Sequence, residues 1–419
     1  MLNLVTENYA ERQGFALTLD EIAREGARRM LMAALTEEST AYVNQFAGEK
    51  DDHGHALVVK NGKANPRDIT LGSGTVEVSQ PRVNDRRPGM KFTSKILPPY
   101  MRKSPKVESL LPILYLKGLS TSDFKSALTE FLGEGTSGLS ASSIVALKRS
   151  WEAEFEEWRK KKLTKRYVYL WADGIHVSIR LGEDKKLCLL VIIGVSENGE
   201  KELLSVSSGY RESKDSWKDV LKDLKDRGLN TPLLAIGDGA LGFWGALREV
   251  EGYETTKEQR CWVHKIANVL DKLPKRIQPK AKSMLHEMMR SETLAHADTA
   301  KNDFVHEFHE KFPEAVQRVE KDWKELTTFF KFPAMHWQHI RTTNAIESSF
   351  ATVRLRTNVT KGAGCKKAAE SMTFKLLEDA QKGWRKIRGH EEIKNLLNGV
   401  AYKDGVVVAT AQHQEDPAA

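Results

Sequence analysis

The chain has 419 residues, of which 40% are hydrophobic and 29% are charged. This composition excludes a disordered chain, and the length suffices for two or three domains with buried cores. There is no apolar run of about 18 residues and no signal-peptide pattern at the N-terminus, so we expect no membrane contact. The three cysteines, Cys188, Cys261 and Cys365, are too dispersed for a disulfide framework, which favours a cytoplasmic protein.

The positive charge is clustered along the chain. The net charge is +8 and the isoelectric point is near 9.1. Residues 81–104 contain seven Lys or Arg and one acid, and residues 159–166 contain six basic residues and no acid. Such blocks favour a polyphosphate partner, since each neutralised phosphate releases counterions; a solvated helix end or linker would also explain them. The candidates for DNA contact in these blocks are Arg82, Arg86, Arg87, Lys160, Lys161 and Lys162.

Residues 1–104 are expected to form an N-terminal region of helices and basic hairpin or loop. One or two amphipathic helices are predicted over residues 19–47, beginning at the cap T-L-D-E. In R-D-I-T-L-G-S-G-T-V-E-V-S-Q-P, residues 67–81, the alternating pattern predicts a hairpin with Gly-Ser-Gly as its turn. The rest of residues 48–104 is rich in Gly, Pro, Asp and Arg and is predicted as loop.

Residues 105–163 predict three short helices with tight turns. The first begins near Val107 and contains Pro112, which requires a kink or a late start. The second follows G-L-S-T-S-D, and the third follows a cap at Ser140. Beside a basic flank this pattern favours a helix-turn-helix-like DNA-binding region, although an ordinary helical bundle would give the same pattern. The residues expected on or near the DNA-facing helix are Ser142, Ser143, Lys148 and Arg149.

The pattern becomes strand-like within residues 164–265. Apolar strands are predicted at residues 167–174, 176–181 and 186–196, with tight connections that indicate antiparallel pairing. An amphipathic helix, a short apolar strand, a second helix and a possible fifth strand at residues 259–263 follow. Three antiparallel strands and then alternating helix and strand predict an α/β fold, in which a mixed sheet has helices on its faces.

The remainder of the chain is predicted to be mainly helical. Residues 266–335 are highly charged and carry no strand signal, and residues 336–398 contain another helical run. No internal repeat indicates a solenoid. Residues 399–419 are expected to form a flexible tail.

Two acids occupy similar positions in the predicted sheet. Asp173 in W-A-D-G and Asp238 in I-G-D-G each end an apolar strand and are followed by Gly. Asp-Gly is also a turn signal, so either acid alone has a structural explanation. A central strand has no structural need for a carboxylate at its end, and an unpaired buried carboxylate is costly. Together the two acids indicate a site whose hard oxygen ligands would select Mg²⁺ or Mn²⁺.

A two-metal phosphoryl-transfer site needs a third carboxylate, and Glu347 is the candidate. It lies in H-W-Q-H-I-R-T-T-N-A-I-E-S-S-F, residues 336–350, among polar and basic neighbours. The alternative is structural, because Asn344 and Glu347 fit an N-cap and its acidic partner at the third helical position. The nearby residues that are placed to contact phosphates are Arg341, Asn344, Arg354 and Arg356.

Taken together, the motifs resemble those of a known family. W-A-D-G, I-G-D-G-A-L-G-F, R-C-W-V-H and R-T-T-N-A-I-E followed by R-L-R-T are similar, in the same order, to motifs of the IS256 (mutator-like) family of DDE transposases. The upstream segments L-Y-L-K-G-L-S-T-S-D-F and G-L-S-A-S-S-I resemble the helical DNA-binding region of that family. The resemblance covers roughly residues 60–395. Asn358 departs from it, since the family pattern leads us to expect Lys at this possible phosphate contact.

The resemblance implies an RNase H-like catalytic core with an all-helical insertion, in which Asp173, Asp238 and Glu347 are the catalytic residues and metal ligands. It implies Mg²⁺-dependent nicking at the terminal inverted repeats of an insertion sequence, attack of the freed 3′-OH on target DNA, and a circular excised intermediate. Mn²⁺ is expected to substitute for Mg²⁺. Because synapsis joins two DNA ends, we expect a homodimer on double-stranded DNA, associated with the nucleoid in a bacterial cytoplasm.

The Cys261-x-x-His264 pair has two interpretations. With His306 and His309 it would supply four zinc ligands, although zinc sites more often carry more cysteines. In the resembling family the pair recurs at the boundary of the insertion, which implies a structural motif that supports the core or lies near DNA. The other histidines, including His176, are expected at the surface or in packing.

Two other functions are compatible with the sequence. An RNase H-like nuclease without strand transfer would use the same three acids, but the basic N-terminal region would then have no role. A non-catalytic DNA-binding protein, such as an inactive copy, would not need three carboxylates, yet all three are present.

Overall fold

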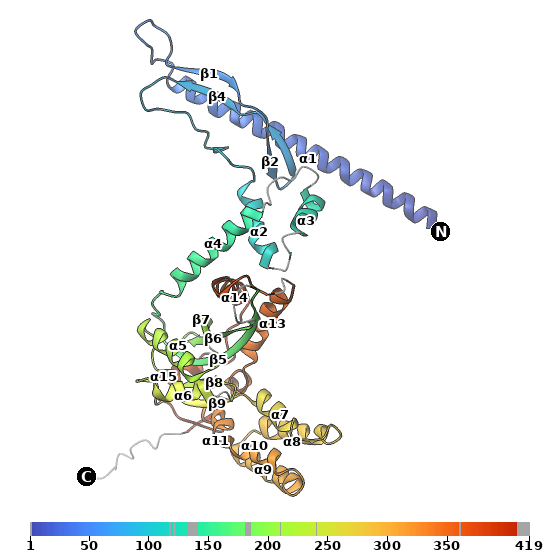
Figure 1. Cartoon of the computed structure of the whole chain (residues 1–419), viewed down its shortest axis with the longest axis vertical. Helices are drawn as coiled ribbons and strands as arrows, with labels where there is room; N and C mark the ends of the chain where they lie inside the picture. Colours follow the sequence, from blue (N-terminus) through green and yellow to red (C-terminus); the bar gives the residue numbers. More distant parts are fainter. Residues whose placement is uncertain are drawn as a thin grey trace, which may run out of the picture. The chain divides into compact units, whose positions relative to one another are not determined.

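The computed structural model describes residues 2–116, 119, 123–132, 141–180, 186–209, 211–239, 241–359 and 362–408. The protein is a mixed α/β structure of many helices, a five-stranded sheet and smaller two-stranded sheets (Figure 1). Contacts along the chain group into two units, Met1–Leu147 and Lys148–Ala419. No helix among the described residues is both long enough and apolar enough to cross a membrane.

In the first unit, the long helix α1 (Leu2–Gln45) packs on two antiparallel strand pairs (Figure 1). The predicted hairpin is confirmed as β2 (Arg67–Leu71) and β3 (Gly74–Val78), while β1 (Val58–Lys63) pairs with β4 (Pro81–Asp85). The β1–β4 pair lies in a stretch predicted as loop, because local patterns do not show pairing between strands so distant in sequence. A small apolar core is shared by Leu35, Ile69, Val76, Val78 and Leu97.

The three helices predicted after this region are present. They are α2 (Pro105–Leu116), which contains Pro112 as expected, α3 (Asp123–Leu132) and α4 (Ala141–Trp158). Residues 117–118, 120–122 and 133–140, which make up nearly all of the connections, lie outside the described residues. The helix-turn-helix arrangement therefore stays a prediction.

The second unit is built on a five-stranded mixed sheet. Its strands are β5 (Tyr167–Ser178), β6 (Lys186–Ser196), β7 (Lys201–Gly209), β8 (Leu234–Gly237) and β9 (Lys257–Arg260). Their order is β7-β6-β5-β8-β9, with β5, β6 and β7 antiparallel and with β8 and β9 parallel to β5. The mixed sheet predicted from the sequence is thus confirmed.

Two details of the strand prediction are wrong. The expected strands at residues 167–174 and 176–181 form one continuous strand, β5, so Asp173 lies inside a strand and not at its end. The expected fifth strand, residues 259–263, stops at Arg260, and the following residues begin helix α7. In both places the end of a strand could not be located from a short apolar run, because the strand or helix that packs against it is distant in sequence.

Helices cover both faces of the sheet, and the side chains on both faces are buried. Every residue from Tyr167 to Ala172 is buried, so alternate side chains of β5 are enclosed on either face. On one face, α5 (Lys214–Asp226) and α6 (Leu241–Glu249) contribute Trp217 and Phe243 to the main apolar core. Helices α13 (Asn344–Val359) and α14 (Lys366–Gln381) pack against β5 and β7 respectively.

The chain between β9 and α13 is all helical, as predicted. It comprises α7 (Trp262–Leu270), α8 (Gln278–Arg290), α9 (Leu294–Phe308), α10 (Pro313–Glu320), α11 (Trp323–Leu326), the 3₁₀ turns Thr328–Lys331 and Ala334–His336, and α12 (Trp337–Ile340). The Trp262 N–H donates a hydrogen bond to the Arg341 carbonyl at 3.0 Å. The two ends of this helical segment are therefore joined to each other at the edge of the sheet.

The end of the described chain is more ordered than expected. After α15 (Glu392–Leu397), β10 (Tyr402–Lys403) and β11 (Val406–Val407) form a hairpin. The Tyr402 hydroxyl donates to the Glu392 carboxylate at 2.6 Å. The predicted tail at residues 399–419 thus begins with structure, and its last part, residues 409–419, lies outside the described residues.

Candidate carboxylate site

Asp173 and Asp238 are brought to the same level of the sheet by the pairing of β5 with β8. This parallel register runs from Tyr169 opposite Leu234 to Ala172 opposite Gly237, so the two aspartates occupy the next positions. Strand β8 ends there, whereas β5 continues to Ser178. The expectation that the two acids lie on adjacent strands is correct, although only Asp238 follows a strand end.

Glu347 reaches the site from the first turn of α13. The Thr343 hydroxyl donates to Glu347 Oε1 at 2.5 Å, and the Glu347 N–H donates to the Thr343 carbonyl at 3.0 Å. Asn344, proposed from the sequence as the N-cap, is the first helical residue and is exposed. The Glu347 carboxylate is therefore held by a side-chain hydroxyl and is not folded back onto a backbone amide as in a capping box.

His264, from α7, links two of the acids. Its Nδ1 lies 4.0 Å from Asp238 Oδ1 and 3.7 Å from Glu347 Oε1. The pKa of His264 is raised to about 9, mainly by its hydrogen bond with Cys261 and also by the Asp238 and Glu347 carboxylates. Asp238 and Glu347 are more than a hundred residues apart in sequence, yet both lie near the same imidazole nitrogen.

Cys261 supports the position of Glu347 through Thr343. It is the fully buried N-cap residue of α7, and its sulfur accepts hydrogen bonds from the Thr343 N–H at 3.3 Å and from the Thr343 hydroxyl at 3.2 Å. The hydroxyl has one proton, so it donates either to Cys261 or to Glu347 at a given moment. The Cys-x-x-His pair therefore contacts the Glu347 side chain through Thr343.

The zinc ligand set considered from the sequence does not assemble. Potential ligand atoms of Cys261, His264 and Glu347 lie within 4.8 Å of one another, and among the described residues His306 and His309 do not join them. The third potential ligand is the glutamate, contrary to the expected pair of histidines from α9.

A fourth acid, Glu212, belongs to this neighbourhood. Burial raises the pKa of Asp173 to about 7; the Gly174 N–H and His264 oppose this rise, and Glu212 and Glu347 add to it. Burial likewise raises the pKa of Glu212, and Asp238 contributes in the same direction. Glu212 was not predicted from the sequence; the only local signal is its place directly before Ser213, the N-cap of α5.

Gly174 allows Glu212 to approach β5. A Cβ atom at position 174 would lie 2.5 Å from Glu212 Oε1, which is closer than real carbon contacts allow. Glycine at this position, which was predicted to be part of a turn, therefore leaves room within the strand for the Glu212 carboxylate, and a larger residue would displace that side chain.

The donor set suits a hard divalent cation. Several carboxylates are crowded in a partly buried place, and burial together with mutual repulsion keeps the pKa of Asp173 high. A bound cation would relieve this repulsion, and carboxylate oxygens are the ligands that Mg²⁺ and Mn²⁺ prefer. Asp173, Asp238 and Glu347 are the residues that would hold it.

The arginines near Glu347 differ in exposure. Asn344 and Arg354 are exposed, as is Asn358, where the family pattern predicts Lys. Arg341 Nη1 donates to the Met289 carbonyl at 2.6 Å, so this side chain ties α8 to the start of α13. Arg356 is 1% exposed, which does not fit the expected phosphate contact in this conformation.

The more distant basic candidates are mostly at the surface. Arg82, Arg86, Arg149, Lys160, Lys161 and Lys162 are exposed, and Lys148 is partly buried. Arg87 is engaged by Asp85 at 2.8 Å and packs 3.6 Å from the Phe46 ring centroid, so its guanidinium is largely used within the first unit. The side chains of Ser142 and Ser143 lie outside the described residues.

Comparison with known proteins identifies the family. A profile described as Transposase, Mutator family, matches residues 3–387. The transposase for insertion sequence element IS6120 of Mycolicibacterium smegmatis is 48% identical over 300 residues, which cover 71% of this chain and 92% of that protein. The transposase for IST2 of Acidithiobacillus ferrooxidans is 47% identical over 281 residues, covering 67% and 94%.

A more distant relative carries the family name used above. The transposase for IS256 in transposon Tn4001 of Staphylococcus aureus is 23% identical over 372 residues, which cover 87% of this chain and 91% of that protein. The resemblance inferred from the motifs is confirmed. The chain belongs to the Mutator family of transposases, together with IS256-type relatives.

Proposed function

We propose that this protein is a DNA transposase that binds the terminal inverted repeats of an insertion sequence and catalyses Mg²⁺-dependent strand cleavage and 3′-OH strand transfer at Asp173, Asp238 and Glu347. The observation that carries the proposal is the position of Asp238 and Glu347 within 4.0 Å of the same His264 nitrogen, with Asp173 in the adjacent register position. The names of the relatives support the activity, since each is a transposase for an insertion sequence element.

The sheet supports an RNase H-like assignment for the core. Three antiparallel strands are followed by two that are parallel to the first, and a helical segment lies between the last strand and the helix of the third acid. This is the arrangement expected of a DDE catalytic core with a helical insertion. Exposed basic residues such as Arg354 and Lys160 would then contact the DNA backbone.

The chemistry is in-line displacement at phosphorus. Asp173, Asp238 and Glu347 would hold the divalent cations, which would supply activation of the attacking oxygen and charge stabilisation of the leaving oxygen. Water attacks in the first cut and the freed 3′-OH attacks in strand transfer, with no covalent protein–DNA intermediate. Thr343 positions the Glu347 carboxylate, and His264 supplies positive charge beside Asp238 and Glu347. Two copies are needed to bring two DNA ends together.

A nicking and joining assay tests the proposal. Purified protein is mixed with duplex DNA from the flanks of its gene and Mg²⁺, alongside Glu347→Gln and the control Glu310→Gln, which changes an exposed glutamate in the helical segment. We expect nicked and joined products from the wild type and the control, and neither product from Glu347→Gln. A gel-shift measurement shows whether all three proteins bind the DNA equally.

The other outcomes lead to the alternative functions. Nicking without joining by the wild type would indicate a nuclease. DNA binding without cleavage by any of the three proteins would indicate a non-catalytic DNA-binding protein. Cleavage by Glu347→Gln at the wild-type rate would remove Glu347 from the site.

A further inference from the structure

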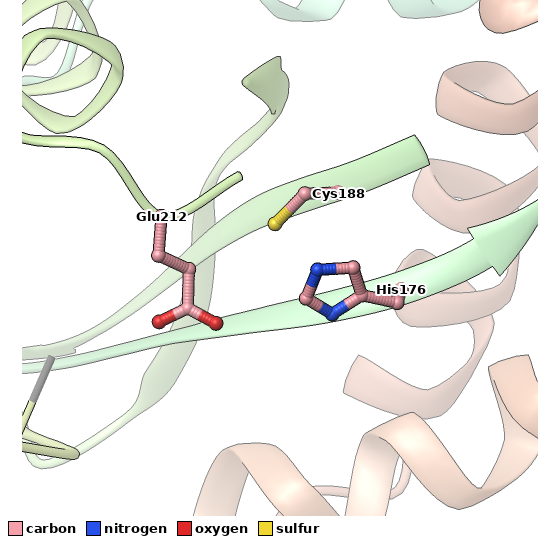
Figure 2. Close-up of side chains that lie close together, drawn as sticks. All are labelled: His176, Cys188 and Glu212. Atoms are coloured by element: carbon pink, nitrogen blue, oxygen red, sulfur yellow. The ribbon is translucent and has the colours of Figure 1, made fainter. Parts of the chain in front are cut away.

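A second group of potential metal ligands, which we call the mixed-donor cluster, consists of His176, Cys188 and Glu212. His176 on β5 is the direct cross-strand partner of Cys188 on β6, so their side chains stand on the same face of the sheet. Glu212 comes from the segment between β7 and α5. The three ligand atoms lie within 4.8 Å of one another, and Figure 2 shows the side chains converging from their three segments.

The side chains of this cluster are not held by hydrogen bonds in the described part of the chain. Among the described residues, no side-chain hydrogen bond or ion pair within the usual distance limits engages His176, Cys188 or Glu212. Cys188 is 3% exposed, Glu212 is half-buried and His176 is exposed. Burying part of a carboxylate without a hydrogen-bond partner costs free energy. A role in packing alone would not explain why Glu212 accepts this cost.

Two glycines leave room for Glu212 at its observed position. A Cβ at Gly174 would collide with the Glu212 carboxylate, and a Cβ at Gly242 would lie 2.1 Å from the Glu212 carbonyl oxygen. Backbone from β5 and from α6 thus closes around this residue from two sides. The carboxylate is directed toward His176 and Cys188 by the fold and not by a hydrogen bond.

We propose that His176, Cys188 and Glu212 bind a borderline-soft divalent cation such as Zn²⁺, at a site separate from Asp173, Asp238 and Glu347. One nitrogen, one sulfur and one oxygen donor form a three-ligand set, and the exposure of His176 leaves a fourth position open to water. A thiolate selects Zn²⁺ or Co²⁺ over Mg²⁺, which prefers oxygen ligands. On binding, the Cys188 thiol releases its proton to solvent and the sulfur coordinates the cation.

The other cysteine cluster is a weaker candidate for this cation. In Cys261, His264 and Glu347 the sulfur already accepts hydrogen bonds from Thr343, and Thr343 also engages the glutamate. Its sulfur and glutamate are therefore hydrogen-bonded within the protein, whereas among the described residues no hydrogen bond engages the donors of the mixed-donor cluster.

A Co²⁺ titration of the full chain, without DNA, tests the proposal. Cobalt bound to a thiolate gives a charge-transfer band in the near ultraviolet, and tetrahedral coordination gives intense visible bands. We expect one equivalent of Co²⁺ to produce both, Zn²⁺ to abolish them, and excess Mg²⁺ to leave them unchanged. The probe reports binding alone, so its result is independent of any DNA cleavage activity.

The three cysteines provide matched variants. Cys188→Ala is expected to lose the thiolate band, while Cys365→Ala, which changes an exposed cysteine, and Cys261→Ala retain it. Because Cys188 is buried, His176→Gln gives a second test at an exposed position, and we expect at least tenfold weaker Co²⁺ binding. A band that survives in Cys188→Ala, or that is lost only in Cys261→Ala, overturns the assignment, as does a wild type that gives no thiolate band.

Discussion

Strand β5 contributes one residue to each of two clusters, and these two residues, Asp173 and His176, are three positions apart. Asp173 belongs to the carboxylate cluster with Asp238 and Glu347, and His176 belongs to the mixed-donor cluster. Side chains alternate along a strand, so these two residues point to opposite faces of the sheet. The strand therefore contributes a carboxylate to one cluster and an imidazole to the other, on opposite faces of the sheet.

The two clusters also differ in how their side chains are held. In the carboxylate cluster, Glu347 is bonded to Thr343 and both Glu347 and Asp238 lie near His264. Glu212, in the mixed-donor cluster, is placed by the close approach of Gly174 and Gly242. Oriented carboxylates suit catalysis, in which the geometry of the transition state must be held, whereas a donor set without internal bonds suits simple binding.

The largest expected effect separates the clusters by function. Asp238→Asn should lower DNA cleavage roughly a thousandfold, since metal stabilisation of a phosphoryl-transfer transition state is worth several kcal/mol. DNA binding and the Co²⁺ band should be unchanged. Asp219→Asn, an exposed aspartate on α5, is the control. Loss of the cobalt band in Asp238→Asn would show that the two clusters share one ion, and unaltered cleavage would show that Asp238 is not a ligand.

A second effect concerns stability in metal-free protein. The pKa of Asp173 is raised from 3.8 to about 7, chiefly by burial, so the folded state retains a proton that the unfolded state releases. Stability should therefore fall as pH rises from about 4 to about 7. With a chelator at pH 8, Asp173→Asn should be more stable than wild type by on the order of 2–4 kcal/mol in urea unfolding.

The same experiment distinguishes charge from packing. At pH 4 the two proteins should unfold at similar urea concentrations, and Mg²⁺ at pH 8 should stabilise the wild type more than Asp173→Asn. If the difference between the proteins does not change with pH, the buried charge of Asp173 is not its cause.

The smallest effect tests the support of Glu347. Thr343→Val keeps the shape of the side chain but removes the hydroxyl that donates to Glu347. We expect cleavage to fall about fivefold, because an ordinary hydrogen bond contributes roughly 1 kcal/mol. DNA affinity should not change, and Thr352→Val, at an exposed position on the same helix, should behave as wild type. An equal loss in both variants would assign the effect to the helix and not to the carboxylate.

The sequence was sufficient to predict that Asp173 and Asp238 lie on adjacent strands and that Glu347 lies early in a helix. Asp238 follows a short apolar strand and Glu347 lies in the first turn of a helix, and both patterns are local. The course of β5 could not be predicted in the same way. Asp173-Gly174 has the composition of a turn, and the close approach of Glu212 to Gly174 is not visible in the sequence.

Other parts depend on contacts between residues that are distant in sequence. The β1–β4 pair joins Val58 to Asp85, and neither strand shows a strong alternating pattern. Glu212 has no motif that marks it as a neighbour of Asp173, since their proximity arises from the turn between β7 and α5. Arg356 was expected to contact DNA from its charge alone, and only packing shows that it is buried.

The hydrogen bond between the Trp262 amide and the Arg341 carbonyl has a consequence for protein engineering. The helical segment leaves the sheet and returns at nearly the same place, so its two ends form a natural graft point. A related segment whose termini lie equally close together could replace it if it keeps a histidine at position 264 and the contacts of Gln259 with Leu326 and Phe329, since loop-closure entropy grows only slowly with length. Chimeras built at this junction can exchange one family member's helical segment for another's while Cys261 and Thr343 keep their contact.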